Sequence, residues 1–171
     1  RVAKVIMPLN NLETAIGIRP RFEDRRVAEN SRALFEVVTL NRDGKPVRTE
    51  NLEYTIYMEH RDYTWFWKSG AWDFEIFTRD EFLLDGRLSV KTSSTAQVSF
   101  EAKWGTYRIE VRDPKSGAVS SFKFNAGWGG SVSGPDRPDR LKVELDKKKY
   151  QAGDTARVFV STPFSGKLVL I

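Results

Sequence analysis

This chain of 171 residues contains no cysteine and a single histidine, His60. Without cysteine it has no disulfide, no thiolate metal site and no cysteine nucleophile. One histidine is too few for a histidine-based catalytic triad or a multi-histidine metal site, and at the end of a strand it is interpreted as a solvated side chain. Long apolar runs are also missing, since none approaches the roughly 20 residues that a membrane-spanning helix needs.

The charges argue against a further class of function. The net charge is +5, from 28 basic and 23 acidic residues, and both signs are interspersed along the chain. A nucleic-acid-binding module gathers its basic side chains on one face with aromatic residues between them. The dense basic runs here are Arg25-Arg26 and Lys147 to Lys149, which are interpreted as solvated turns, so no nucleic-acid partner is expected.

The chain does contain a clear hairpin pattern between residues 104 and 128. Tyr107, Ile109 and Val111 alternate with charged residues, which is the period of two of a strand with one buried face. The sequence DPKSG then supplies a turn, because proline presets φ and glycine accepts a positive φ. A returning strand follows, with Phe122 and Phe124 on one face.

The same period of two recurs upstream, where seven or eight short strands are expected between residues 13 and 126. Residues 13 to 22 are at best an edge strand, because Pro20 cannot donate to a ladder. A helix competes with a strand over residues 25 to 38, but the β-branched and aromatic second half favours the strand. The pattern predicts an all-β fold, a two-sheet antiparallel β-sandwich. The side chains expected in its core are Phe35, Val37, Ile56, Val98, Phe100, Tyr107, Ile109, Val111 and Phe122.

Residues Tyr63 to Phe77 are unusually aromatic, with seven aromatic residues in fifteen. They are predicted to form a hairpin of two short strands joined by a glycine turn at residues 68–70. The preferred interpretation places the large aromatics in the core or in a contact between domains. The alternative is a carbohydrate-binding β-sandwich module, in which exposed rings stack on sugars. The residues concerned are Trp65, Trp67, Trp72 and Phe74.

No catalytic, cofactor-binding or metal-ligating residue is assigned, and the chain is not expected to be an enzyme. Asp80, Glu81 and Asp85 come nearest to an acidic cluster, but they lack the ligand spacing of a calcium loop and are interpreted as turn formers. Gly127, Gly129 and Gly130 resemble a phosphate-binding loop only superficially, because no helix follows them.

Composition divides the chain into four parts. Residues 1–12 are interpreted as a lead-in from a preceding domain, 13–128 as the sandwich, 129–138 as a Gly/Ser/Pro linker, and 139–171 as the start of a second domain. Three strands are expected in this last part, too few to bury both faces of a sandwich. The chain begins with Arg1 and ends inside an apolar run, so it is expected to be a piece of a longer protein with its second domain truncated.

Several runs of residues resemble a known family. FEVVTLNRDGKPV, YTWFWKSGAWDFEIF and WGTYRIEVRDPKSG with SFKFNAGW are similar to the macroglobulin domains of bacterial alpha-2-macroglobulins. RPDRLKVELDKKKYQAGDTARVFVSTPFSGKLVLI resembles the opening of the bait-region domain that follows them. The resemblance covers nearly all of residues 13 to 171, and its most specific parts are the YQAGDTARV turn and the WGTYRIEV strand.

This resemblance implies seven-stranded, fibronectin III-like sandwiches strung in a large periplasmic protein, often a lipoprotein anchored to the inner membrane. Such proteins trap proteases: the protease cuts an exposed bait segment, and the protein closes around it. Many members also carry a thioester between a cysteine and a glutamine, which a chain without cysteine cannot form. The resemblance therefore implies a structural scaffold within a broad-spectrum endopeptidase inhibitor. The implied partners are proteases and neighbouring macroglobulin domains, and no cofactor is implied.

Overall fold

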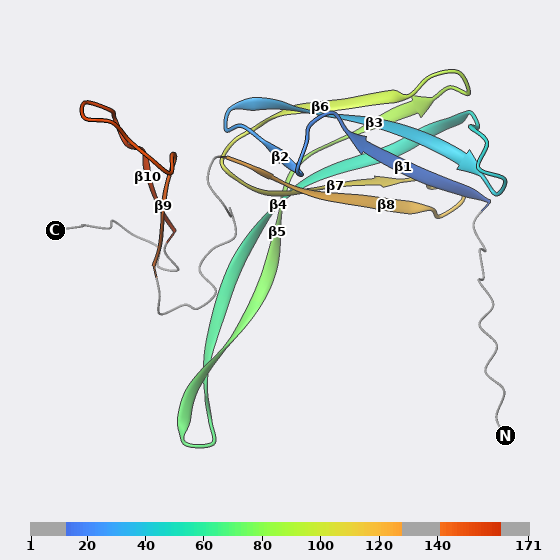
Figure 1. Ribbon diagram of the computed structural model, residues 1–171. Coiled ribbons are helices and arrows are strands. Elements are labelled where there is room, and N and C mark those ends of the chain that lie inside the picture. The colour runs from blue at the N-terminus through green and yellow to red at the C-terminus, as the bar shows by residue number, and fades with distance from the viewer. Residues whose placement is uncertain (1–12, 128–140, 162–171) are drawn as a thin grey trace, which may run out of the picture.

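The computed structural model describes residues 13–127 and 141–161 (Figure 1). Every regular element in these two ranges is a strand, so the predicted all-β class is confirmed. The predicted lead-in (1–12), linker (129–138) and third strand of the second domain (167–171) lie outside the described residues. The strands are β1 (Thr14–Pro20), β2 (Arg26–Val27), β3 (Ser31–Asn41), β4 (Thr49–Lys68), β5 (Ala71–Val90), β6 (Ala96–Ala102), β7 (Gly105–Arg112), β8 (Val119–Ala126), β9 (Lys142–Leu145) and β10 (Val158–Ser161).

Strands β1 to β8 form the two layers of the predicted sandwich (Figure 1). One sheet has the order β1-β3-β6 and the other the order β2-β8-β7-β4-β5. The pairings are antiparallel except that of the two-residue strand β2, which runs parallel to β8. Strand β1 lies at a sheet edge, as its Pro20 requires.

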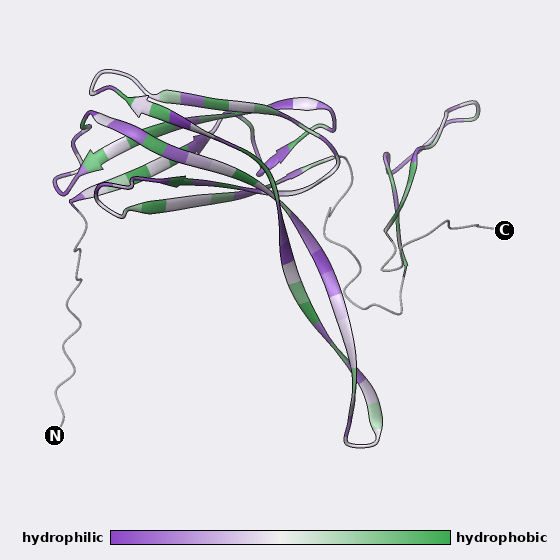
Figure 2. Cartoon of the chain, turned by 180° about the vertical axis from the view of Figure 1, so that it is seen from behind, coloured by the Kyte–Doolittle hydropathy of each residue, from purple (hydrophilic) through white to green (hydrophobic). Residues whose placement is uncertain are grey.

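The core lies between the two sheets and includes a cluster of phenylalanine rings around Phe35 of β3. Phe22, Phe122 and Phe124 contact this ring at centroid distances of 5.4, 6.1 and 5.2 Å. Apolar and polar residues alternate over Phe122 to Ala126 of β8, as a sheet with one dry face requires, and Figure 2 colours the strands by hydropathy. Of the nine predicted core residues, seven are buried, and Phe100 and Phe122 pack partly buried against them.

Strands β4 and β5 are much longer than their neighbours, at 20 residues each. They meet at Ser69 and Gly70, whose φ angles of 52° and 84° are both positive, as in the type I′ turn of tight hairpins. Strand β7 accompanies β4 only as far as the pair Thr106 and Glu59. Residues 60–79 therefore leave the sandwich as a two-stranded ribbon, called the arm below (Figure 1). The prediction of two short strands is wrong, although the position of the turn is confirmed.

Strand β5 contains a β-bulge in the segment where the sequence predicted turns. Ile56 of β4 pairs with Leu84, whereas the next residue, Tyr57, pairs with Phe82, which leaves Leu83 as an extra residue. The insertion reverses which residues of β5 face the core, so Leu84 packs against it while Phe82 is exposed. Asp80, Glu81 and Asp85 flank this bulge inside the strand and are not turn formers.

Beyond the sandwich, β9 and β10 form an antiparallel hairpin in which Val143 pairs with Val160 and Leu145 with Val158. Leu141, Val143, Leu145 and Val158 of this segment are exposed. One ring contact joins this hairpin to the sandwich, because Phe159 stacks on Trp104 with centroids 4.0 Å apart.

Candidate functional site

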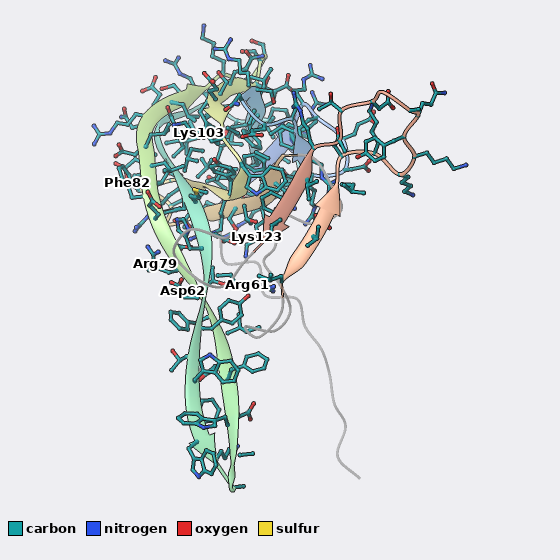
Figure 3. The ribbon with its side chains drawn as sticks, turned by 90° about the vertical axis from the view of Figure 1, so that its left-hand side faces the viewer. Arg61, Asp62, Arg79, Phe82, Lys103 and Lys123 are labelled. Atoms are coloured by element: carbon teal, nitrogen blue, oxygen red, sulfur yellow. The ribbon has the colours of Figure 1, made fainter. Side chains whose placement is uncertain are left out.

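The arm has two chemically different faces. Side chains alternate across a ribbon with period two, and the cross-strand pairs Tyr63–Ile76, Trp65–Phe74 and Trp67–Trp72 therefore share one side. This side, called the aromatic face, carries no charged residue over three successive rungs. Figure 3 shows the arm projecting from the sandwich with rings along its length.

The rings of the aromatic face pair across the two strands and still remain open to solvent. Trp67 and Trp72 meet edge to face, with centroids 5.5 Å apart and planes at 78°, and Trp65 meets Phe74 at the same distance and 60°. Such pairs stabilise a ribbon by up to about 1 kcal/mol each. Trp65, Trp67 and Trp72 nevertheless remain 44%, 61% and 66% exposed. Of the two places predicted for these tryptophans, the core is wrong, and the contact between domains stays a prediction.

The opposite side of the arm, the polar face, is held by ion pairs. Arg79 donates from Nε to Asp62 Oδ2 at 3.0 Å, and His60 Nε2 lies 2.5 Å from Glu81 Oε2. His60, predicted to be solvated, is partly buried and lies within hydrogen-bond distance of Glu81. Lys68, Asp73 and Glu75 follow towards the turn on this face, which also carries Phe66 and the exposed Phe77. The charged side chains beyond Arg61 are thus confined to one side of the ribbon.

Arg108 of β7 fixes the root of the arm. Its guanidinium donates to Glu59 of β4 at 3.2 Å and to Glu110 at 2.8 Å, and it also bonds Asp80 of β5. It lies 4.7 Å from the centre of the Tyr57 ring, a favourable cation–π position. Because Glu59 and Asp80 are a cross-strand pair, one side chain ties β7 to both strands of the arm. We call Arg108, Glu59 and Asp80 the root clamp.

The electrostatics of the root clamp are those of a partly buried ion cluster. The side chain of Glu59 is only 7% exposed and that of Arg108 20%, and Lys123 of β8 adds a second contact to Glu59 at 2.6 Å. Burial of the Arg108 guanidinium acts to lower its pKa, but the surrounding carboxylates, Asp80 foremost, outweigh that effect and raise the pKa above its ordinary value. The alternation of the sequence predicts that Arg108 lies on the wet face of its strand. Its partners could not be predicted in this way, because they depend on the register of β4, β5 and β7.

The other residues considered from the sequence do not converge on a site. Asp80, Glu81 and Asp85 follow one another along β5, where Asp80 belongs to the root clamp and Glu81 pairs with His60. Gly127 lies against the ring of Trp104, and a Cβ on it would come 2.6 Å from that ring, whereas Gly129 and Gly130 are outside the described residues. Within 13–127 and 141–161, no three metal-ligating side chains lie together, and no helix could cross a membrane.

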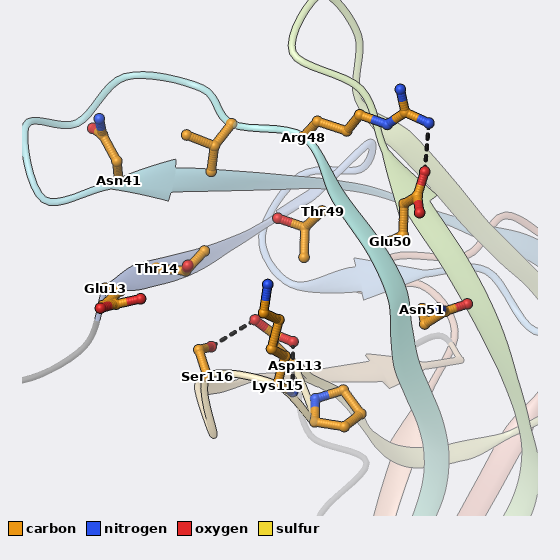
Figure 4. A pocket seen from close by; sticks show the side chains of 12 residues that line it. Glu13, Thr14, Asn41, Arg48, Thr49, Glu50, Asn51, Asp113, Lys115 and Ser116 are labelled. Atoms are coloured by element: carbon orange, nitrogen blue, oxygen red, sulfur yellow. Dashed lines mark hydrogen bonds and ion pairs between the residues drawn. The ribbon is translucent and has the colours of Figure 1, made fainter.

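A hollow of about 760 Å³ lies at one end of the sandwich, between the β3–β4 connection and the β7–β8 turn (Figure 4). Its most buried acid, Asp113, accepts hydrogen bonds from the Lys115 amide at 2.9 Å and the Ser116 hydroxyl at 2.6 Å. At the rim, Glu50 is paired with Arg48. Asp113 thus holds the β7–β8 turn, and Glu50 holds the start of β4, so both carboxylates have a structural role.

Comparisons with a family model, with known sequences and with solved structures all indicate the same family. Residues 17–128 match the model of the bacterial macroglobulin domain 6. The chain is 37% identical over 172 residues to an alpha-2-macroglobulin of Xylella fastidiosa strain 9a5c, which covers 98% of this chain and 10% of that protein. Its structure is similar to Escherichia coli alpha-2-macroglobulin in the native conformation, with a TM-score of 0.64, 33% identity, and coverage of 88% of this chain and 11% of that one. The same E. coli protein activated by porcine elastase matches with a TM-score of 0.59 and 33% identity over 78% of this chain and 12% of that one. The chain thus spans about a tenth of the length of the relatives it matches.

Proposed function

The chain belongs to the bacterial alpha-2-macroglobulin family, and from this membership we propose that it is a non-enzymatic scaffold segment of a protease-trapping inhibitor. The observation that carries the proposal is the match of residues 17–128 to a macroglobulin domain, within a similarity to alpha-2-macroglobulins that extends over 98% of the chain. Activation of the E. coli relative by porcine elastase supports proteases as partners of the whole protein.

Within this proposal the two parts of the chain have different roles. The sandwich acts as a rigid spacer, since its two sheets share one continuous core. Residues 139–171 begin the domain that bears the bait, and they meet the sandwich through the stacked pair of Trp104 and Phe159. We further infer a periplasmic location for the longer protein, with an N-terminal lipid on the inner membrane. Cell fractionation with and without a blocked lipid attachment site tests that location.

The full-length polypeptide that contains this chain provides the test of trapping. After incubation with elastase, cleavage of a large protein substrate should fall while cleavage of a small chromogenic peptide continues, because an enclosed active site still admits small molecules. Equal loss of both activities would indicate an inhibitor that blocks the active site. No loss of either would contradict the proposal, provided that elastase cleaves the polypeptide.

A second candidate function is carbohydrate binding by the arm. The exposure of Trp65, Trp67 and Trp72 favours it, since sugar-binding modules present aromatic rings to solvent. The ring planes favour it less, because pairs crossed at 60° and 78° do not form one flat stacking platform. Quenching of tryptophan fluorescence by soluble oligosaccharides would support this function, and an unchanged spectrum would oppose it.

A further inference from the structure

The aromatic face of the arm requires a covering surface. A two-stranded ribbon is marginally stable by itself in water, and a third layer or strand is normally needed. Among residues 13–127 and 141–161, the third strand beside the arm is β7, and it ends at the pair of Thr106 and Glu59. At roughly 250 Å² for each tryptophan, the exposed fractions of Trp65, Trp67 and Trp72 leave about 430 Å² of their surface open. An area of this size equals that of the largest apolar patch on a typical monomer, and such patches are often functional.

We propose that the aromatic face docks on another folded domain of the same longer polypeptide, and that the arm thereby fixes the position of the sandwich relative to that domain. The inference rests on the proposed function in one respect only, because both take this chain to be one segment of a multidomain protein. The relatives, about ten times longer than the region they share with this chain, support that premise.

The size of the open surface agrees with this occupant. Contacts between domains of one chain bury about 600 to 1,500 Å² in total, or roughly 300 to 750 Å² on each side, and the three tryptophans alone supply an area within that range. A standard contact between separate proteins buries about 800 Å² on each side, so a free partner would have to cover much more of the arm than these three rings.

The reach and charge of the arm agree with the same occupant. Nine residue steps from Glu59 to Lys68 at 3.3 Å each give a projection of about 30 Å, which is close to the diameter of a domain of 100 residues. Residues 60–79 hold three basic and three acidic side chains, so the arm has no net charge with His60 neutral. A nucleic acid or an anionic membrane surface selects basic side chains, whereas an uncharged apolar surface with a polar rim fits this one.

The arm is also prepared for docking before a partner arrives. The root clamp fixes its base, crossed ring pairs hold its middle, and a type I′ turn closes its tip. A rigid ribbon loses little conformational entropy on binding, so a modest apolar area yields a stable contact.

Photo-crosslinking in the full-length polypeptide tests the inference. The photoreactive residue p-benzoylphenylalanine replaces Trp72 on the aromatic face in one variant, and Glu75 on the polar face of the same strand in the control. After irradiation, mass spectrometry identifies the crosslinked peptides. The expected result is an intramolecular crosslink from position 72 to a peptide outside residues 1–171, with no such product from position 75.

Each other outcome overturns the inference. Crosslinks from position 72 to a second copy, to another protein, to a lipid or to a sugar would assign the face to a different occupant. Absence of any product, or equal products from both positions, would show that the face is not covered. The trapping assay on the unmodified protein is read separately, so loss of the docking inference and loss of the proposed function remain distinguishable.

Discussion

Replacement of Arg108 by alanine should release the root of the arm while the sandwich stays folded. The guanidinium bonds carboxylates on three strands: Glu59 on β4, Asp80 on β5 and Glu110 on its own strand β7. Strand β5 makes no ladder with β7, because β4 lies between them. The Arg108 side chain thus joins elements that the backbone does not join.

The magnitude follows from the burial of the partners. Glu59, 7% exposed, would keep Lys123 but lose the Arg108 bond, and a hydrogen bond to a charged group is worth about 1.5 to 3 kcal/mol. Asp80 and Glu110 are 39% and 33% exposed and can regain water, so their share is small. Loss of the cation–π contact adds roughly 0.5 to 1 kcal/mol. We expect a total of about 2 to 4 kcal/mol, which overlaps the lower end of the range for breaking a fully buried pair.

Urea unfolding and hydrogen exchange measure this effect in the 171-residue chain. Exchange should rise at the amides of residues 71–82 and remain unchanged in β8. Arg79→Ala is the matched control, since its pair with Asp62 is exposed at 57% and 38% and should contribute about 0.5 kcal/mol or less. If Arg108→Ala is as mild as Arg79→Ala, or if exchange rises evenly through the sandwich, the root clamp does not hold the arm.

Three further outcomes are expected. Ile109→Ala, at a fully buried position in β7, should cost about 2 to 5 kcal/mol in the free energy of unfolding, and a loss under about 0.5 kcal/mol would contradict the assigned core face. The hydrogen bond from Arg19 lowers the pKa of Glu36, so this carboxylate contributes stability above its unfolded-state pKa near 4 and loses it as pH falls through the lower folded-state pKa. The urea midpoints of wild type and Glu36→Gln should therefore approach each other as pH falls, and a gap that stays the same from neutral pH into acid would contradict this linkage. Gly127→Ala places a Cβ against Trp104 at a φ of 138° and should cost about 2 kcal/mol, more than Gly117→Ala, where φ is 75° and the space is open; equal costs would show that the ring yields freely.

The sandwich could be predicted from sequence because its inner strands repeat one simple rule. Tyr107, Ile109 and Val111 alternate without interruption in β7, and all three are buried. In a strand of this kind the alternation alone identifies the buried face, so the prediction does not depend on which strands lie beside it. The hairpin of β7 and β8 follows from the same rule together with the DPKSG turn, which Asp113 closes with its own carboxylate.

The length of β5 could not be predicted in this way, because its alternation is broken once. The extra residue Leu83 joins two halves of opposite phase, so EFLLDG looks like an interruption between elements. Gly86 adds to that impression, since glycine usually marks a turn, but here it faces Tyr54, and a Cβ on it would lie 2.6 Å from the Tyr54 hydroxyl oxygen. The extra residue Leu83 forms a bulge within the strand, and Gly86 leaves room for the Tyr54 ring, so both features belong to one continuous strand.

The exposure of the tryptophans could not be predicted for a different reason. Alternation tells which residues share a side of a strand, but not what lies over that side. Along β4 the odd-numbered residues from Tyr57 to Trp67 share one face, which bears the ion cluster of Arg108 and Glu59 near the sandwich and the aromatic face further out. The change in chemistry falls just beyond the end of β7, since Arg61 still follows Glu59 on this face and the aromatic run begins at Tyr63. A charged cluster suits the wet face of a sheet, whereas a run of indole rings on the same face implies that the arm enters different surroundings beyond this point. Where the pairing with β7 ends, the outer face of β4 therefore continues as the surface that we propose another domain covers.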